Sequence, residues 1–334
     1  MKGFRMPAEW HPHERTLMAW PCRREMWGPL LADAKDQYAG VARAIARFEP
    51  VTMVAASSGD AHEARGACEG ADIEVVELPA DDSWLRDNGP TFVLSADGTS
   101  RVGVCFDFNA WGEKFTPYDR DAALTAKLVE LMGDEIHRVP LVLEGGSICV
   151  DGRGALITTE QCLLHESRNP DLGRDEIAQV LREALGVERV VWLGQGLVED
   201  RDTDGHVDLI AAFAAPGTVL LQQVRPDNPN HAAMVENRRR LEGAGIEVIP
   251  FPYLSYAEVG GATTVVSHMN FYICNGAVVV PVAGQSHDDD VLAAIGDAYP
   301  GREVVGVRAE VIAAGGGGPH CITQQVPARA GAPT

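Results

Sequence analysis

Cys321 has the most nucleophilic type of side chain in the sequence, and its setting is unusual. It follows the run GGGGPH at residues 315–320, and four glycines permit close backbone approaches that a core strand does not need. Most cysteines are small buried hydrophobes, and we interpret the other six in that way. The glycine run favours a nucleophile at Cys321, and the lack of a following Lys-Ser/Thr excludes a phosphate-binding P-loop.

His206 and Asp208 lie two residues apart in the sequence DTDGHVD. On a β-strand, positions i and i+2 project to the same face, so the imidazole and the carboxylate would share one space. The pattern also fits two solvated strand residues or two ligands of a zinc site. No HExxH motif accompanies the pair, and we interpret His11-Pro12-His13 as a loop, so we expect no metal.

Two further carboxylates lie in distinctive settings. Asp87, in WLRDNGP, either pairs with Arg86 in a turn or accepts hydrogen bonds from a planar cation such as a guanidinium. Glu144 follows the apolar run VPLVL and precedes two glycines, so it ends a buried strand. A carboxylate there is costly unless it is paired, which favours a functional role. Trp27 and Trp111 fit core positions and the lining of a substrate entrance equally well.

Strand-like hairpins recur along the chain and would position these residues. The residues that open them are Gly89, Gly145, His206, Asn270 and His320, at intervals of 56, 61, 64 and 50 residues. Turns such as Asn-Gly at residues 275–276 are strong signals for a two-residue hairpin. A period of this length predicts radial repetition, in which equivalent strand ends converge on an axis.

Each hairpin is followed by a stretch with helical periodicity and then by a third strand. The predicted third strands are residues 73–78, 135–142, 189–194, 246–251 and 303–311. The last unit has one hairpin strand before the chain ends, so residues 16–21 must supply its partner and close the ring. We therefore predict an α/β fold, a five-bladed α/β-propeller of ββαβ repeats. It would form one domain over residues 1–334, with a core of about 4–328 and a tail of 329–334; the alternative is a doubly wound sheet.

Composition and charge restrict the class of protein. The chain has 334 residues, of which 46% are hydrophobic and 23% charged, so it can bury a sizeable core and is not disordered. No apolar run approaches a membrane span, and the N-terminus lacks a signal-peptide pattern. Seven scattered cysteines without a CxxC pair are typical of a reducing compartment, so we expect a cytoplasmic location. The net charge of −20 disfavours nucleic acid and attracts small cations.

Several segments of the chain resemble the agmatine deiminases, a branch of the guanidine-modifying (pentein) superfamily. The resemblance runs from about residue 4 to residue 328 and implies the pentein fold with five pseudo-repeats, in agreement with the spacing. The segments that carry it are MPAEW (6–10), DSWLRDNGP (82–90), FNAWG (108–112), LEGGSICVDGRGALITTEQCLLHESRNP (143–170), DTDGHVD (202–208), NFYICNGAVVVP (270–281) and GGGGPHCITQQVPA (315–328).

The resemblance implies a role for each candidate residue. Cys321 is expected to be the nucleophile and His206 the general acid/base. Asp87 and Asp208 are expected to bind the guanidinium, and Glu144 to contact the histidine or the substrate. The expected substrate-binding residues are Asp87, Asp208, Trp84, Arg86, Trp111, Gly316 and Gly317.

The expected reaction is hydrolysis of agmatine to N-carbamoylputrescine and ammonia through a covalent S-alkylthiouronium, without metal or cofactor. The alternatives are a deiminase or amidinotransferase acting on arginine or peptidyl arginine, a non-catalytic binding propeller, and a metallohydrolase. The chain departs from the family at Pro319 and at Ser267-His268-Met269-Asn270, a change that bears on the substrate. The expected partner is a small cationic guanidine, with no nucleic acid or membrane, and a homodimer is considered.

Overall fold

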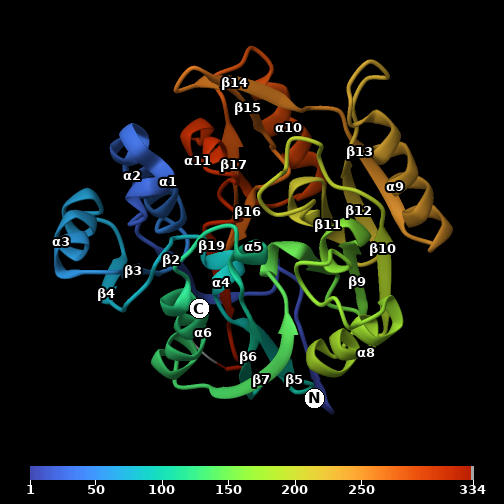
Figure 1. Ribbon diagram of the computed structural model, residues 1–334, viewed down its shortest axis with the longest axis horizontal. Helices are drawn as coiled ribbons and strands as arrows, with labels where there is room; N and C mark the ends of the chain where they lie inside the picture. Colours follow the sequence, from blue (N-terminus) through green and yellow to red (C-terminus); the bar gives the residue numbers. More distant parts are fainter. Residues whose placement is uncertain (332–334) are drawn as a thin grey trace.

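The strands form six sheets in the computed structural model, which describes residues 1–331. Five of these sheets share one pattern, in which the first two strands are antiparallel and the third is parallel to the second. Figure 1 shows the sheets arranged around a centre that holds the short helices α4 and α5, with the longer helices on the outside. The arrangement confirms the predicted α/β-propeller of ββαβ repeats. That the chain forms a single domain stays a prediction.

Four blades follow one another along the chain, each with two antiparallel strands, an outer helix and a parallel third strand. Their elements are β5 (Thr91–Ser95), β6 (Arg101–Asp107), α6 (Asp119–Leu131) and β7 (Glu135–Val142); β8 (Ile148–Val150), β9 (Ala155–Thr159), α8 (Arg174–Leu185) and β10 (Arg189–Leu193); β11 (Ala211–Ala215), β12 (Thr218–Gln222), α9 (His231–Gly243) and β13 (Glu247–Phe251); and β16 (Tyr272–Cys274), β17 (Ala277–Val282), α10 (Asp288–Ala298) and β18 (Glu303–Arg308). The first of these sheets gains a short edge strand, β1 (Phe4–Arg5).

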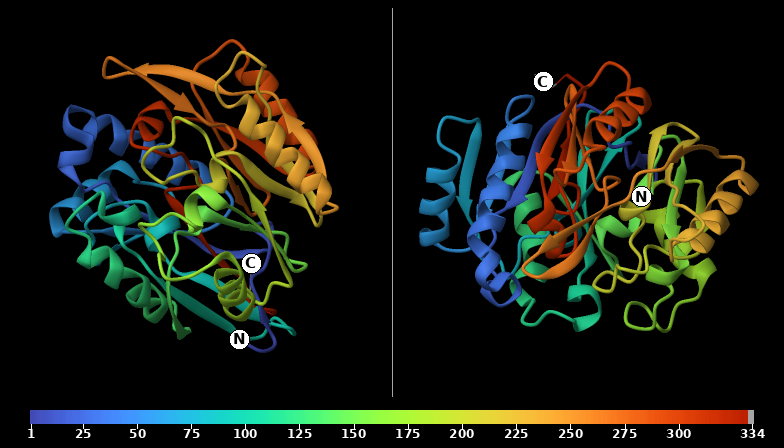
Figure 2. Two further views of the ribbon diagram at one scale, coloured as in Figure 1. Left: turned by 45° about the vertical axis from the view of Figure 1, so that its right-hand side comes forward. Right: turned by 90° about the horizontal axis from the view of Figure 1, so that it is seen from above.

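The fifth blade joins the two ends of the chain. Its antiparallel pair is β19 (Thr323–Pro327) with β2 (His13–Ala19), in register at Thr323 and Met18, as the ring-closure argument predicts. Figure 2 shows the red C-terminal part lying against the blue N-terminal part. The two helices and two strands that complete the blade are α2 (Leu31–Ile45), β3 (Val51–Ala55), α3 (Ser58–Ala67) and β4 (Ile73–Glu77).

Two predictions about the N-terminal unit are wrong. Residues 73–78 were predicted as the third strand, but β3 takes that position parallel to β2, and β4 is a fourth strand beyond it. The reason is the extra helix α3, which forms a second crossover and adds a strand at the sheet edge. His13 begins β2 rather than lying in a loop, because its backbone pairs with Pro327.

Local chemistry explains the helices that cover the blades. In α8, Ile177, Leu181 and Leu185 recur at helical spacing, and each is 0% exposed against the sheet. The Glu176 side chain accepts a hydrogen bond from the Gly173 N–H at 2.7 Å and so caps the first turn. Gly186 ends the helix with φ +67°, a conformation that favours glycine.

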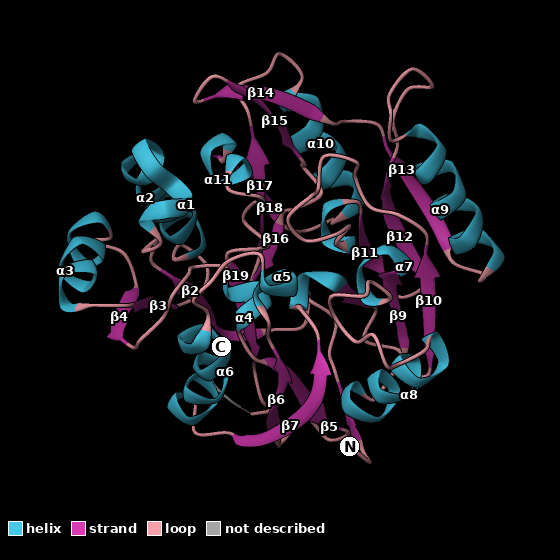
Figure 3. Ribbon diagram, viewed as in Figure 1, coloured by secondary structure: helices cyan, strands magenta, loops and turns pink. Residues whose placement is uncertain are grey.

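Short helical turns, rather than strands, precede the first strands of three blades, with α4 before β5 (Figure 3), η2 before β8 and η3 before β11. These and the other short helices are α1 (Arg24–Trp27), η1 (Gly28–Leu30), α4 (Leu85–Asn88), α5 (Ala110–Glu113), η2 (Gly145–Ser147), α7 (Glu160–Leu163), η3 (Val207–Leu209) and α11 (Glu310–Ala314). The prediction that His206 and Asp208 lie on a strand is therefore wrong, since β11 begins only at Ala211.

A hairpin outside the repeat pattern packs near the Gly-rich segment. Strands β14 (Ser255–Val259) and β15 (Ala262–Val266) form a separate two-stranded sheet, which the sequence did not predict. The hairpin contacts α11, which leads directly into residues 315–318.

No helix within residues 1–331 is long and apolar enough to cross a membrane. Residues 332–334 of the predicted tail lie outside the described part of the chain.

Candidate active site

The openings of the blades bring the predicted residues together at the centre of the molecule. Gly146 marks the point where they meet. A Cβ built on it would lie 2.6 Å from His206 Nδ1, 2.8 Å from Asp208 Oδ2 and 2.9 Å from Asp87 Oδ1. Only glycine leaves room for this approach. All three side chains are buried, so their charges interact in a poorly solvated space.

Asp87 lies in α4, and both of its carboxylate oxygens accept protein hydrogen bonds. Oδ1 accepts from the Gly146 N–H at 2.9 Å, and Oδ2 accepts from the Trp111 indole Nε1 at 2.9 Å. His206 Nδ1 is 3.9 Å from Asp87 Oδ2. Burial raises the pKa of Asp87 to about 6, although the nearby His206 opposes the shift. At neutral pH the carboxylate is ionised and favours a further cation beside it.

Glu144 and His206 form a charged pair supported by Arg168. Arg168 Nε donates to Glu144 Oε1 at 2.6 Å, and both side chains are fully buried. Glu144 Oε2 is 3.8 Å from His206 Nε2. Burial alone would raise the pKa of Glu144, but His206 and Arg168 hold it below its usual value. Burial alone would lower the pKa of His206, but Asp87 and Glu144 raise it well above its usual value, so the imidazole is protonated.

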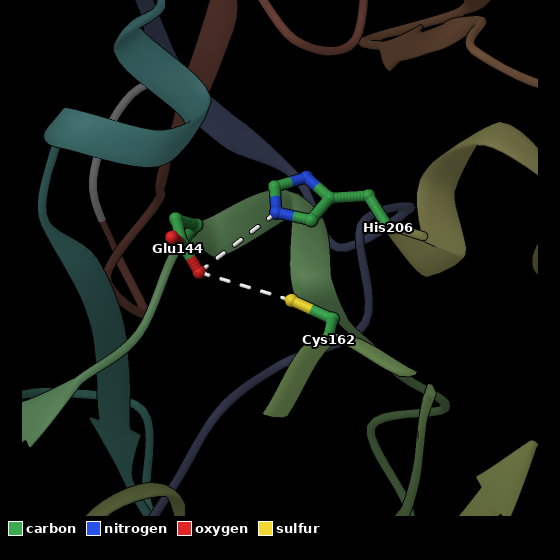
Figure 4. A group of neighbouring side chains, drawn as sticks. All are labelled: Glu144, Cys162 and His206. Atoms are coloured by element: carbon green, nitrogen blue, oxygen red, sulfur yellow. Dashed lines mark hydrogen bonds and ion pairs between the residues drawn. The ribbon is translucent and has the colours of Figure 1, made fainter. Parts of the chain in front are cut away.

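Cys162 completes a small cluster with this pair (Figure 4). Its Sγ is 3.9 Å from Glu144 Oε2, and one ligand atom from each of Glu144, Cys162 and His206 lies within 4.8 Å of the others. Zinc accepts such a donor set. However, Arg168 already pairs with Glu144, and burial with the Glu144 charge raises the pKa of the Cys162 thiol. Protonated sulfur and imidazolium are poor ligands, so the cluster is better suited to proton transfer.

Cys321 faces the same space from the start of the last strand. Its thiol donates to Asp208 Oδ2 at 3.4 Å, and its N–H donates to Asn270 Oδ1 at 3.1 Å. Burial raises the pKa of the thiol well above its usual value, and the carboxylates of Asp208 and Asp87 add to the shift. Cys321 is therefore a neutral thiol in the free protein, and it needs an added cation nearby to ionise.

A narrow pocket leads to Cys321 and Asp87, and the space inside it that water can reach is only about 20 Å³. Its walls are largely apolar, and within the described chain no Lys or Arg lines it. The lining residues are Met26, Trp84, Asp87, Trp111, Phe115, Asp202, Thr203, Gly315, Gly316 and Cys321. Apolar walls with carboxylates beside them suit an alkyl chain that ends in a cation.

Two of the predicted tryptophans line this pocket, and a third lies behind it. Trp84 and Trp111 form part of the wall. Trp27 stacks on Trp84, with ring centroids 5.9 Å apart, and lies over Gly315, where a Cβ would come within 2.4 Å of its ring. Trp27 therefore supports the wall instead of lining the entrance.

Asp202 is the second carboxylate that lines this pocket, besides Asp87. It is half-buried, and its carboxylate has no hydrogen-bond or ion-pair partner among residues 1–331. Burial and the neighbouring Asp200 raise its pKa, while Lys114 opposes the shift. A cation at this position would stabilise the ionised form of Asp202. Asp202 is a residue that sequence reasoning missed.

The glycines before Cys321 are held close to the reactive groups. A Cβ on Gly317 would lie 2.8 Å from Cys321 Sγ and 2.8 Å from the Trp84 ring. A Cβ on Gly316 would lie 3.2 Å from Asp202 Oδ2, and its φ of +111° favours glycine. Both positions border the pocket or the nucleophile, and their contact with a substrate stays a prediction.

Arg86 has partners other than the pocket. Its N–H donates to the Cys321 carbonyl at 3.1 Å, and its Nε donates to the His320 carbonyl at 3.3 Å. Its guanidinium Nη1 lies 3.9 Å from Glu9 Oε1. These contacts place Arg86 behind the nucleophile, where it supports the backbone of residues 320–321 instead of meeting a ligand in the pocket.

Backbone strain concentrates around the site. Within residues 1–331, the non-glycine residues with positive φ are Ala110, Trp111, Glu113 and Asp204. Trp111 donates to Asp87, and Asp204 accepts from Arg168 Nη1 at 2.9 Å, which in turn holds Glu144. Unfavourable backbone conformations persist only where surrounding contacts impose them, and they cluster at functional sites.

Two buried residues next to the predicted site were missed by sequence reasoning. His320 contacts Asp208 through Nδ1 at 2.8 Å and Glu9 through Nε2 at 2.9 Å. Glu9 lies in MPAEW and His320 lies in HCITQQ, two of the segments that carry the family resemblance. Their positions in these segments were the signal by which the sequence could have identified them. With Arg86, they extend the central cluster to four carboxylates and four cations, all of them buried. The cations are Arg86, Arg168, His206 and His320, and the carboxylates are Glu9, Asp87, Glu144 and Asp208.

Known proteins resemble this chain in sequence and in fold over nearly its full length. Residues 5–327 match the family model of the Porphyromonas-type peptidyl-arginine deiminases. An agmatine deiminase of Pseudomonas aeruginosa is 43% identical, with 98% of this chain and 96% of that protein covered. The structure of the Enterococcus faecalis agmatine deiminase superposes with a TM-score of 0.92 at 35% identity, covering 98% of this chain and 96% of that one. A C. jejuni agmatine deiminase with substrate bound superposes at 0.90 with 25% identity, covering 98% and 97%. The chain therefore belongs to the Porphyromonas-type peptidyl-arginine deiminase family, together with the agmatine deiminases it resembles.

Proposed function

We propose that this protein hydrolyses agmatine to N-carbamoylputrescine and ammonia, with Cys321 as nucleophile. The observation that carries the proposal is the pair of buried carboxylates, Asp87 and Asp208, beside one thiol at the end of an apolar pocket. Carboxylates pair with a planar guanidinium through parallel hydrogen bonds, which fixes its orientation. Relatives named agmatine deiminases, about 42% identical over nearly the full chain, support the same substrate.

Asp87 and Asp208 would hold the guanidinium with its carbon facing Cys321 Sγ. Asp208 Oδ1 lacks a hydrogen-bond partner within the described residues, so it is free to accept from the substrate. Asp87 Oδ1 and Oδ2 each have a remaining lone pair besides the bonds from Gly146 and Trp111. Such positioning replaces a bimolecular encounter with an oriented one and accounts for part of the rate enhancement.

The bound substrate would help to ionise its own nucleophile. The central cluster already balances four carboxylates against four cations, and Cys321 is neutral. A guanidinium adds one positive charge to this buried set, and loss of the thiol proton restores neutrality. The substrate therefore lowers the pKa of Cys321, and the thiolate forms only when there is something to attack.

His206 would transfer the protons in both halves of the reaction. The thiolate adds to the guanidinium carbon, and the protonated imidazole gives its proton to the departing ammonia, leaving an S-alkylthiouronium on Cys321. The neutral imidazole then takes a proton from water, whose oxygen attacks the same carbon. Collapse of this adduct breaks the C–S bond, the departing sulfur takes the proton of the adduct's hydroxyl group to restore the neutral thiol, and the ureido product is released. Glu144, held by Arg168, keeps the imidazolium stabilised between turnovers.

Asp202 would bind the primary ammonium at the other end of agmatine. It lies at the pocket together with Trp84, Trp111 and Phe115, whose rings can pack against the butyl chain. Free arginine has a carboxylate at that end, which Asp202 repels, and within residues 1–331 no basic side chain lines the pocket to pair with it. This feature favours agmatine over arginine and peptidyl arginine.

Steady-state assays of ammonia and ureido product on agmatine, arginine and benzoyl-arginine amide test the proposal. We expect kcat/KM for agmatine to exceed that for arginine by at least about 100-fold, equivalent to about 2.7 kcal/mol. Comparable values for arginine would show that agmatine is not the preferred substrate, while hydrolysis of a guanidinium group would still stand.

The proposal also includes a cytoplasmic location, supported by the seven cysteines, all of them free.

A further inference from the structure

The residue before the nucleophile is enclosed between two carboxylates. His320 Nδ1 lies 2.8 Å from Asp208 Oδ2, and His320 Nε2 lies 2.9 Å from Glu9 Oε1. His320 is 5% exposed, and it does not line the pocket that leads to Cys321. Asp208 Oδ2 contacts both His320 and the Cys321 thiol, so this carboxylate links the ring to the nucleophile. His320 therefore acts on the reaction through other residues.

The two contacts together determine the protonation of the ring. Ionised carboxylates only accept hydrogen bonds, so both ring nitrogens of His320 must carry a proton, as they do in imidazolium. The charged groups that face the ring are Glu9, Asp208 and Arg86, and Arg86 Nη1 lies 3.9 Å from Glu9. Two negative and two positive charges then balance. A neutral imidazole would place a lone pair against one of the carboxylates.

We propose that His320 is a permanent imidazolium that positions Asp208 and supplies the fixed positive charge behind Cys321. Asp208 Oδ2 receives both the His320 Nδ1–H and the Cys321 thiol, at 2.8 and 3.4 Å. This leaves Oδ1, which has no partner within the described chain, as the oxygen directed to a guanidinium. This inference rests on the proposed function only in taking Cys321 as the nucleophile.

Glu9 connects the His320–Asp208 pair to the N-terminal segment. It precedes β2, so the first residues of the chain complete a site whose other members come from the blade openings. Its carboxylate holds the proton on His320 Nε2, while the backbone carbonyl of the same residue lies 2.8 Å from His13 Nε2. A series of hydrogen-bonded contacts therefore extends from Glu9 through His320 and Asp208 to the thiol of Cys321.

The variant His320→Asn removes the positive charge of the ring but keeps a hydrogen-bond donor to Asp208. The Asn amide can still donate to Asp208 from a position close to that of Nδ1, but it carries no charge and does not reach Glu9. The readout is the rate of Cys321 alkylation by iodoacetamide without substrate, measured from pH 7 to 10, where the thiol is mostly protonated and the rate is proportional to the small fraction of thiolate. We expect this rate to be at least about tenfold lower in His320→Asn at each pH, because loss of the positive charge raises the pKa of the thiol.

The control is His231→Asn, a partly buried histidine at the start of α9, whose Nδ1 lies 3.1 Å from the Val224 carbonyl oxygen. It should leave the rate of Cys321 alkylation unchanged. An alkylation rate for His320→Asn that equals that of the wild type would overturn the inference. Because this readout needs no turnover, it is independent of whether agmatine proves to be the substrate.

A second measurement observes the charge of His320 directly in the unaltered protein. Nitrogen-15 NMR of labelled histidine distinguishes imidazolium from either neutral tautomer. We expect the His320 signals, assigned by their loss in His320→Gln, to remain those of imidazolium at pH 8.5. His320 signals of a neutral ring at pH 7 would overturn the proposal.

Discussion

At the scale of single residues, the ionisation of Asp87 should control how well the protein captures a guanidinium. Burial raises the pKa of this carboxyl to about 6, so it gains a proton as the pH falls through that value. The protonated form attracts a cation poorly. The kcat/KM for agmatine should therefore fall about tenfold per pH unit below about pH 6, because kcat/KM reports the free enzyme. A constant kcat/KM down to pH 5 would contradict this role.

Asp202 should determine the affinity for the ammonium end of the substrate. Replacing it with Asn keeps the shape and removes the charge, so KM for agmatine should rise about tenfold while kcat changes less than threefold. Butylguanidine, which lacks the ammonium, should show no such change. Asp289→Asn, an exposed carboxylate in α10, is the control. Equal effects on the two guanidines would show that Asp202 acts on the fold instead of on the ammonium.

Sequence reasoning identified the five central residues but not the residues that support them. Cys321, His206, Asp208, Asp87 and Glu144 lie in local motifs that are unusual by themselves, and the structure brings them together. Their chemical roles stay predictions. Glu9 and His320 contact partners far away in the chain, and Asp202 meets Cys321 only where distant segments form one pocket, so a single sequence contains no record of these arrangements. The contact between Cys162 and Glu144 was missed in the same way, because Cys162 was interpreted as a core residue.

At the scale of elements, the turn η2 should tolerate no side chain at Gly146. A Cβ there would come within 3 Å of His206, Asp208 and Asp87, so Gly146→Ala must displace at least one of them. We expect kcat/KM to fall at least about 100-fold while the circular dichroism spectrum is retained.

A glycine in open space provides the control for that substitution. Gly40 lies within α2 with no atom near its Cβ position, and Gly40→Ala should stabilise the protein by about 0.4–1 kcal/mol with full activity. If Gly146→Ala behaved like Gly40→Ala, the packing described at the centre of the site would be wrong.

The elements that sequence patterns predicted are the ones that repeat. Apolar periodicity and Asp-Gly or Asn-Gly turns identified the hairpins and most third strands, because each blade buries one face of its sheet under a helix. The prediction failed where the chain leaves the repeat, at α3 with β4 and at the β14–β15 hairpin. It also failed at η3, where the contacts of His206 and Asp208 override the strand pattern of DLIAAFAA.

At the scale of the whole molecule, the net charge should influence the capture of substrate. A protein of charge −20 attracts a dication more strongly than a monocation, and salt screens both attractions. The kcat/KM for agmatine should therefore fall more steeply with sodium chloride than that for butylguanidine. Parallel slopes between about 20 and 500 mM salt would show that the acidic surface and Asp202 contribute nothing to capture.

The central claim is that Cys321 forms a covalent bond with the carbon of the agmatine guanidinium. Acid quench of the protein during turnover, followed by mass spectrometry of its peptides, tests this claim directly. We predict an added mass of agmatine less ammonia on the peptide that contains Cys321, and neither adduct nor turnover in Cys321→Ser, whose loss of rate should be at least about 10⁴-fold. Cys105→Ala, a buried cysteine outside the site, should keep both. An adduct on Cys162, or turnover in Cys321→Ser above one tenth of the wild-type rate, would contradict the claim.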